Sequence, residues 1–195
     1  TVPYLFFFLL ITLLIFFMGG YFKIDRKIIL ILVSIFFYSW WNIYYLPVIL
    51  FSIIINYYFY KKLISSESNK KKILLIGIAS NVFVLIIFKY TDFIIENINL
   101  IFSTNISYLN LPFPLAISFY TFQTIAFLIN VYDEDILDVK MKDFFLFVIF
   151  FPQLIAGPIV KYNNMMPQFS NEHNKWFNKK NFIIGLIILF IGLIK

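Results

Sequence analysis

The chain has 195 residues, of which 62% are hydrophobic and 13% are charged; its formal net charge is +6 and it has no cysteine. A soluble domain is about half apolar and about a quarter charged, so this composition excludes an ordinary soluble protein. The lack of cysteine excludes disulfides and thiolate chemistry. The lysines stand in short loops beside apolar runs, where they orient a membrane protein and meet anionic lipid, so the positive charge does not indicate nucleic-acid binding.

The first half of the chain predicts membrane helices. Residues 4–18 form an apolar run that approaches the roughly 20 residues needed to cross a bilayer. Residues 28–60 would overshoot a core of roughly 30 Å as a single helix, so two short or tilted spans, joined near residues 42–47, are expected. Asn56 lies near the middle of the second of these spans and is expected to face another helix.

The loop at residues 61–72 carries five lysines and a serine-rich centre. The positive-inside rule places it in the cytoplasm. Another span follows at residues 73–88, with Asn81 in its middle. Residues 92–109 mix apolar and polar side chains, which predicts an amphipathic segment lying in the membrane interface.

Residues 112–132 form a span that two prolines open, as suits a helix start. Polar residues recur along it on two stripes: Ser118, Thr121 and Thr124 every three residues, and Gln123 and Asn130 seven apart. These groups would be unpaired in lipid, so they should face protein or a water-filled path. Interhelical hydrogen bonding and tunnel lining both remain open for them.

The next apolar run, residues 144–155, is interrupted by Pro152 and followed by Gly157 and Pro158, which predicts a kinked or re-entrant helix. Residues 160–180 are polar and are expected to lie along a surface, before a last span at residues 182–194. Counting spans alternately from the lysine-rich loop puts residues 160–180 outside the cell, against the charge rule. A re-entrant helix removes this conflict, and the sequence leaves both topologies open.

Two groups of residues invite a catalytic or metal-binding interpretation. His173 stands in a strongly polar stretch without the apolar surroundings that dry an active site, so a solvated loop histidine is expected. The acidic residues of the loop lack the spacing of a calcium site and have lysines close by, so a solvated loop face is expected. They are Asp133, Glu134, Asp135 and Asp138. No metal site is predicted.

Together these elements predict an all-α, polytopic membrane protein with about six to seven membrane segments and a broken or re-entrant helix near Pro152. The first residue is Thr1 rather than methionine, and the last span has barely ended when the chain stops. We expect both ends to be cut. Residues 1–195 would then be the N-terminal part of a single multi-pass domain without its C-terminal part.

Two segments resemble signatures of the membrane-bound O-acyltransferases (MBOAT), in the bacterial branch of alginate O-acetylation and teichoic-acid D-alanylation membrane proteins. PLAISFYTFQ at residues 114–123 is similar to that branch's PLGISFYTFQ, with Ala116 in place of the usual glycine. FFPQLIAGPI at residues 150–159 is similar to the second signature. Weaker similarities at residues 37–41, 56–57 and 88–90 keep the family's order.

The resemblance implies a ring of membrane helices around a funnel or tunnel, in the inner membrane of a bacterium. An acyl group, acetyl by this likeness, would pass from a cytoplasmic thioester, a substrate rather than a bound cofactor, toward a surface or secreted polysaccharide with the help of a periplasmic acyltransferase. D-alanyl transfer from a carrier protein stays open. The family's catalytic histidine follows a tryptophan in the C-terminal half; this chain has no Trp-His pair and His173 does not match.

We therefore assign no catalytic residue and expect this portion to be inactive alone. The signature positions are expected to shape the core or the substrate tunnel. They are Ser118, Tyr120, Gln123, Pro152, Gln153, Gly157 and Pro158. Two alternatives remain: a non-enzymatic transporter or channel subunit, in which the polar stripes bind a solute, and the product of a degenerate gene.

Overall fold

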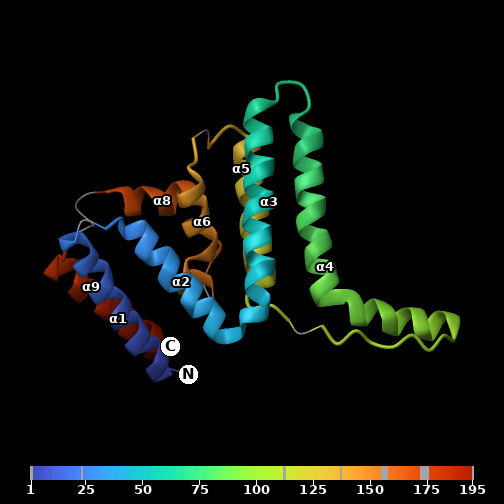
Figure 1. The fold of residues 1–195 in the computed structure, drawn as a ribbon, viewed down its shortest axis with the longest axis horizontal. Helices are drawn as coiled ribbons and strands as arrows, with labels where there is room; N and C mark the ends of the chain where they lie inside the picture. Colours follow the sequence, from blue (N-terminus) through green and yellow to red (C-terminus); the bar gives the residue numbers. More distant parts are fainter. Residues whose placement is uncertain are drawn as a thin grey trace.

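A computed structural model of the chain describes residues 2–22, 24–111, 113–136, 138–154, 158–171 and 176–194. These residues are helical or irregular and contain no strand, which confirms the all-α prediction. Figure 1 shows the helices in their chain order. Their bounds are α1 Val2–Tyr21, α2 Arg26–Asn42, η1 Ile43–Tyr45, α3 Leu46–Ser65, α4 Lys70–Phe102, α5 Ile117–Tyr132, α6 Met141–Ile149, α7 Phe151–Leu154, α8 Tyr162–Ser170 and α9 Lys179–Ile194.

Two helical stretches are long and apolar enough to cross a membrane, Arg26–Ser65 and Lys70–Phe102, and two shorter apolar helices accompany them, Phe7–Gly19 and Ile117–Tyr132. The first stretch is divided as the sequence predicts. Helix α2 ends at Asn42, whose side chain accepts a hydrogen bond from the backbone N–H of Tyr44 at 2.9 Å. Pro47 then lies in the first turn of α3, where its missing N–H costs nothing. The count of six to seven membrane segments stays a prediction.

Helices α3, α4 and α5 pack together around a polar pair in an otherwise apolar centre (Figure 1). Asn56 of α3 and Asn81 of α4 are both buried and exchange amide hydrogen bonds of 2.9 and 2.6 Å. The Thr124 hydroxyl of α5 lies 3.1 Å from the Asn81 carbonyl oxygen. This arrangement confirms that Asn56 faces another helix, and it fixes the register of three helices because each amide satisfies the other.

Helix α4 differs from its prediction. Its 33 residues form one helix that ends at Phe102, instead of a span followed by a separate amphipathic segment ending at Leu109. No proline or glycine stands between residues 88 and 93, so nothing in the sequence ends the helix there. Figure 1 shows α4 bending, with its second part running away from the bundle and the following chain returning beside it.

Polar side chains of α4 hold that returning chain. The Asp92 carboxylate accepts hydrogen bonds from the backbone N–H groups of Leu109 and Asn110, at 2.9 and 3.1 Å. Asn99 accepts another from the N–H of Ile106 at 2.9 Å. The polar residues that indicated an amphipathic segment therefore bind the extended chain that follows the helix. Helical periodicity does not reveal this role.

Helix α5 begins at Ile117, five residues after its predicted start, because Ala116 takes a left-handed conformation with φ 59° and ψ 20°. A side chain makes this conformation cost about 1 to 2 kcal/mol, which glycine avoids. Ala116 is the position where the signature sequence has glycine, so the backbone explains that preference.

We expect Ala116→Gly to raise the free energy of unfolding by about 1 kcal/mol. The matched change Ala126→Gly, in the interior of the same helix, should lower it by about 0.5 to 1 kcal/mol because glycine weakens a helix. Thermal unfolding in one detergent compares the two. Destabilisation by both changes would show that the left-handed turn carries no strain.

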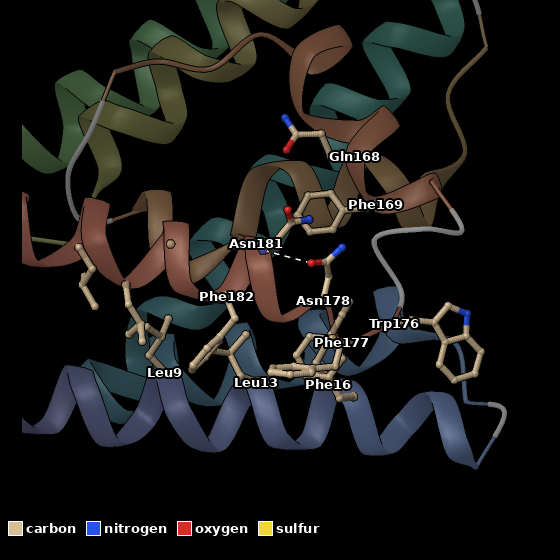
Figure 2. A pocket seen from close by; sticks show the side chains of 14 residues that line it. Leu9, Leu13, Phe16, Gln168, Phe169, Trp176, Phe177, Asn178, Asn181 and Phe182 are labelled. Carbon is tan, nitrogen blue, oxygen red and sulfur yellow. Dashed lines mark hydrogen bonds between the residues drawn. The ribbon is translucent and has the colours of Figure 1, made fainter.

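Helix α9 lies beside α1 at the edge of the bundle, and side chains of the two face each other across a cavity (Figure 2). The Phe17 and Phe177 rings meet edge to face with centroids 5.5 Å apart, which places the start of α9 next to the end of α1. The two ends of the described chain consequently lie close together in Figure 1.

Candidate functional site

The candidate site is built around a break in the helix that carries the second signature. Helix α6 ends at Ile149, Phe150 leaves the helical conformation with φ −56° and ψ 107°, and the four-residue helix α7 follows. Pro152 lies in α7 and has no N–H with which to continue the helix. The predicted break near Pro152 is confirmed, and it occurs two residues earlier.

The two signature segments meet at one buried backbone carbonyl that loses its helical hydrogen bond at the break. In a continuous helix the Phe147 carbonyl would accept from the N–H of Phe151. Here it accepts from the side-chain amides of Gln123 in α5 and Gln153 in α7, at 2.9 and 3.1 Å. The N–H of Phe151 donates instead to the Ser34 hydroxyl of α2 at 3.2 Å. Side chains of three elements, α5, α7 and α2, therefore supply the hydrogen-bond partners that these two backbone groups lose at the break. Buried backbone groups require such partners.

Among the described residues, two buried oxygen atoms on α5 find no hydrogen-bond partner: Oε1 of Gln123 and the hydroxyl of Tyr120, one turn earlier. Both side chains are almost fully buried. An unpaired polar atom in an apolar interior costs about 1 to 3 kcal/mol, so such atoms call for a functional explanation. They could hydrogen-bond a donor or acceptor group that enters beside the break.

Among the described residues, the other signature positions donate no hydrogen bond to this carbonyl. Ser118 is half-buried, while Pro152 and Pro158 are exposed. Gly157 lies outside the described residues. Thr121 and Thr124 of the hydroxyl stripe are buried, and Thr124 belongs to the asparagine pair described above.

The chain returns from the break to the end of the bundle at which α6 began. Asn163 of α8 donates to the Asp135 carbonyl at 2.9 Å, and Lys27 donates to the Ser170 hydroxyl at 3.0 Å. Nine residues give α6 a length of about 13.5 Å, roughly half of a bilayer core. The start of α6 and helix α8 therefore lie at one end of the bundle, which is the geometry that the predicted re-entrant helix requires.

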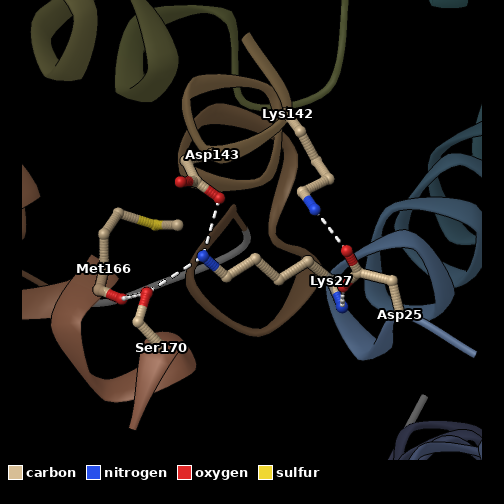
Figure 3. A network of polar contacts seen from close by, with 6 residues as sticks. All are labelled: Asp25, Lys27, Lys142, Asp143, Met166 and Ser170. Atoms are coloured by element: carbon tan, nitrogen blue, oxygen red, sulfur yellow. Dashed lines mark hydrogen bonds and ion pairs between the residues drawn. The ribbon is translucent and has the colours of Figure 1, made fainter. Parts of the chain in front are cut away.

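An ion-pair network fastens this end of the element (Figure 3). Nζ of Lys27 lies 2.7 Å from the Asp143 carboxylate, with both side chains mostly buried, and Lys142 pairs with Asp25. Partial burial raises the pKa of Asp25, but the hydrogen bonds from Lys142 and from the Lys27 N–H outweigh it and hold that pKa below its usual value. The contact between α2 and α6 consequently keeps its charges until the solution is strongly acidic, and weakens as the pH falls through this lowered pKa.

The remaining loops with charge lie at the same end. Lys70 pairs with Glu134 at 2.6 Å, which joins the loop before α4 to the loop after α5. Arg26 stacks on Trp176 at 5.2 Å and brings the start of α9 there as well. Among the residues that the structure describes, the lysines and the arginine gather at this cation-rich end, except Lys89, about 28 Å along α4.

The sequence profile of MBOAT, the membrane-bound O-acyltransferase family, matches residues 35–195. The chain belongs to this family. A search of solved structures finds no match.

Curated relatives of this MBOAT chain are bacterial. It is 42% identical to the peptidoglycan O-acetyltransferase of Helicobacter pylori, over 63% of this chain and 28% of the relative. It is 36% identical to the probable alginate O-acetylases AlgI of Pseudomonas putida and Pseudomonas aeruginosa, over 51% of this chain and 21% and 20% of those relatives. The match thus spans about a quarter of the length of these proteins.

The MBOAT sequence also contains one histidine and a group of acidic loop residues, which are candidates for catalysis or metal binding. His173 lies outside the described residues. Asp133, Glu134 and Asp135 are exposed, as expected of a solvated loop. The transporter alternative called for a carboxylate within the membrane; in the described part of the chain the aspartates and glutamates are exposed or half-buried.

Ser34 is the contact that the sequence analysis missed, because a single serine in an apolar run carries no signal of its partner. We expect Ser34→Ala to lower the free energy of unfolding by about 1 to 2 kcal/mol, since the buried N–H of Phe151 loses its acceptor. Ser39→Ala, on the same helix and half-buried, is the control and should change it little. Equal effects of the two changes in thermal unfolding would contradict the role of Ser34.

Proposed function

We propose that the protein to which this chain belongs is a membrane-bound O-acyltransferase that transfers an acetyl group from a cytoplasmic thioester to a hydroxyl of a cell-surface or secreted polysaccharide. Family membership supports the reaction class. The functions that the names of the relatives give, O-acetylation of peptidoglycan and of alginate, support the acetyl group and the class of acceptor. The observation that carries the proposal to this chain is the meeting of both signature segments at the Phe147 carbonyl.

The orientation follows from charge. The cation-rich end carries the starts of α2, α4 and α6, and by the positive-inside rule it faces the cytoplasm in an inner membrane. The thioester donor then enters from this end. The break at Phe150 lies about halfway across the membrane, where irregular backbone is tolerated only if it is buried in protein or lines a cavity.

The reaction breaks the thioester bond and forms an ester, while the proton of the acceptor hydroxyl passes to the departing thiolate through a general base. The resemblance implies that this base is the histidine in the C-terminal half of the family's members. Within the chain, the unpaired Tyr120 hydroxyl and Oε1 of Gln123 are the groups that would orient the acyl carbonyl and the acceptor hydroxyl. The apolar surroundings keep water from the thioester. A periplasmic acyltransferase partner assists this transfer to the polysaccharide.

The test expresses the full-length protein in a bacterium without its own O-acetyltransferase and measures the acetate that mild alkali releases from the envelope polysaccharide. Wild type should add ester-linked acetate. Pro152→Ala should lower it about 10-fold or more at equal expression, because a straightened helix displaces the site. Pro167→Ala, a proline within the surface helix α8, is the control.

Three outcomes would count against the proposal in different ways. Alkali-labile alanine in place of acetate would replace the acyl group and keep the enzyme class. No ester on any polysaccharide from well-expressed protein would overturn the acyltransferase function. Full activity of Pro152→Ala would show that acyl transfer does not need the break in the helix.

A further inference from the structure

A cavity of about 550 Å³ lies between α1 and α9, outside the site described above. Figure 2 shows Leu9, Leu13 and Phe16 of α1 facing Phe182 of α9 across it. Phe17 and Leu9, eight residues apart, both line it, so it extends about 12 Å along α1, most of the depth of one membrane leaflet. Most of the side chains that line it are apolar, and Asn178 and Asn181 line it near the start of α9.

Arg26 lies beside two aromatic rings of the cavity wall. Its guanidinium lies 5.7 Å from the ring centroid of Phe16 and 5.2 Å from that of Trp176, and both rings line the cavity. The side chain is only 9% exposed, and its buried Nε has no hydrogen-bond partner in the part of the chain that the structure describes. No ion pair to Arg26 is found among the described residues.

A buried guanidinium without a counter-ion is costly, so its position calls for an anion. The neighbouring acid does not serve, because the Asp25 carboxylate is taken up by Lys142 and by the Lys27 N–H. Lys179 and Lys180 open α9 and add positive charge to the end of the helix that Arg26 approaches through Trp176. The site therefore combines positive charge at one end of the cavity with apolar side chains along its length.

We propose that this groove binds an anionic phospholipid of the cytoplasmic leaflet, with the phosphate against Arg26 and one acyl chain along α1 and α9. Basic pockets between membrane helices are suited to such headgroups, and the phosphate supplies the missing partner of the guanidinium. The acyl chain fills the apolar space as far as Leu9 and Leu189. This site is separate from acyl transfer and would stand if the proposed activity failed.

The groove offers a matched pair of variants to test the acyl-chain position. Gly185 of α9 lines the cavity, and a Cβ added there meets no atom within 4 Å. Gly192, on the same helix, is equally open but does not line it. Gly185→Leu should fill the groove without a clash, while Gly192→Leu makes the same change to the helix elsewhere.

The experiment reconstitutes the full-length protein in bilayers with phosphatidylglycerol or phosphatidylcholine that carries a photoreactive diazirine on the acyl chain. Cross-linked peptides are located by mass spectrometry. Labelling of α1 and α9 by phosphatidylglycerol should exceed that by phosphatidylcholine about tenfold, the ratio expected for one charge-assisted hydrogen bond. Arg26→Met should reduce it to the phosphatidylcholine level and Arg26→Lys should preserve most of it.

Gly185→Leu should lower labelling by both lipids at α1 and α9, and Gly192→Leu should leave it unchanged. Melting curves for each variant show that the fold is kept; if Arg26→Met does not fold, the two glycine variants still decide. Equal labelling by the two lipids would overturn the anion site. Absence of labelling in the wild type would show that another part of the protein fills the groove, and would overturn the proposal.

Discussion

Asn81→Leu is expected to lower the free energy of unfolding by about 2 kcal/mol. The change removes both hydrogen bonds between Asn81 and Asn56 and the contact of Thr124 with the Asn81 carbonyl oxygen. The carbonyl oxygen of Asn56 is then left buried without its donor. For a chain of this size the melting temperature should fall by roughly 4 to 8 °C, as measured by thermal unfolding in detergent.

Two further variants separate the pair from a general effect of removing an amide. Asn97→Leu is the control, because Asn97 lies on the second part of the same helix and its side chain donates to the Phe93 carbonyl of its own helix. The double change Asn56→Leu with Asn81→Leu should cost less than the sum of the two single changes, since no orphaned amide remains. Additive losses, or an equal loss for Asn97→Leu, would contradict the pairing.

The double change Gln123→Met and Gln153→Met should lower the free energy of unfolding by about 2 to 3 kcal/mol, more than the sum of its parts. Each glutamine alone still satisfies the Phe147 carbonyl, whereas removal of both leaves that buried carbonyl without a donor. Gln123→Met alone should cost less than about 1 kcal/mol, because it also removes the unpaired Oε1. Thermal unfolding of the four proteins completes the cycle.

Gln123→Met also distinguishes a structural role from a role in catalysis. If Oε1 of Gln123 contacts a substrate, acyl transfer by the full-length protein should fall about 10-fold although stability is nearly unchanged. Gln168→Met, on the surface of α8, is the control for loss of an amide. Normal activity of a stable Gln123→Met protein would show that Gln123 has no role in catalysis and acts through its hydrogen bond to the Phe147 carbonyl.

Much of the fold could be predicted because single residues control it locally. Asn42 and Pro47 divide the long apolar stretch, and Pro152 breaks the later one, each through its own backbone chemistry. The end of α4 could not be placed in this way. The helix passes its polar residues without a break, and what they bind, the returning chain at residues 106–110, depends on contacts remote in sequence.

The candidate site was predicted in part. Gln123 and Gln153 stand out as amides in apolar runs, but their shared acceptor depends on the crossing of α5 with the broken helix. Likewise, Asn56 and Asn81 are each visible as costly residues, and their pairing follows only from the register of α3 and α4. Ser34 could not be told from Ser39 or Ser52 by sequence, because hydroxyls in apolar helices usually bond within their own helix.

The entry and return of residues 141–171 at one end of the bundle can be tested directly by cysteine accessibility, since the chain has no cysteine of its own. Single cysteines replace Ser68 in the loop before α4, Asn164 on α8 and Tyr44 at the opposite end, all exposed. A membrane-impermeant thiol reagent added outside intact cells should label Tyr44→Cys alone, and Ser68→Cys and Asn164→Cys only after lysis. Labelling of Asn164→Cys from outside would mean that the broken helix crosses the membrane, and would contradict the re-entrant site.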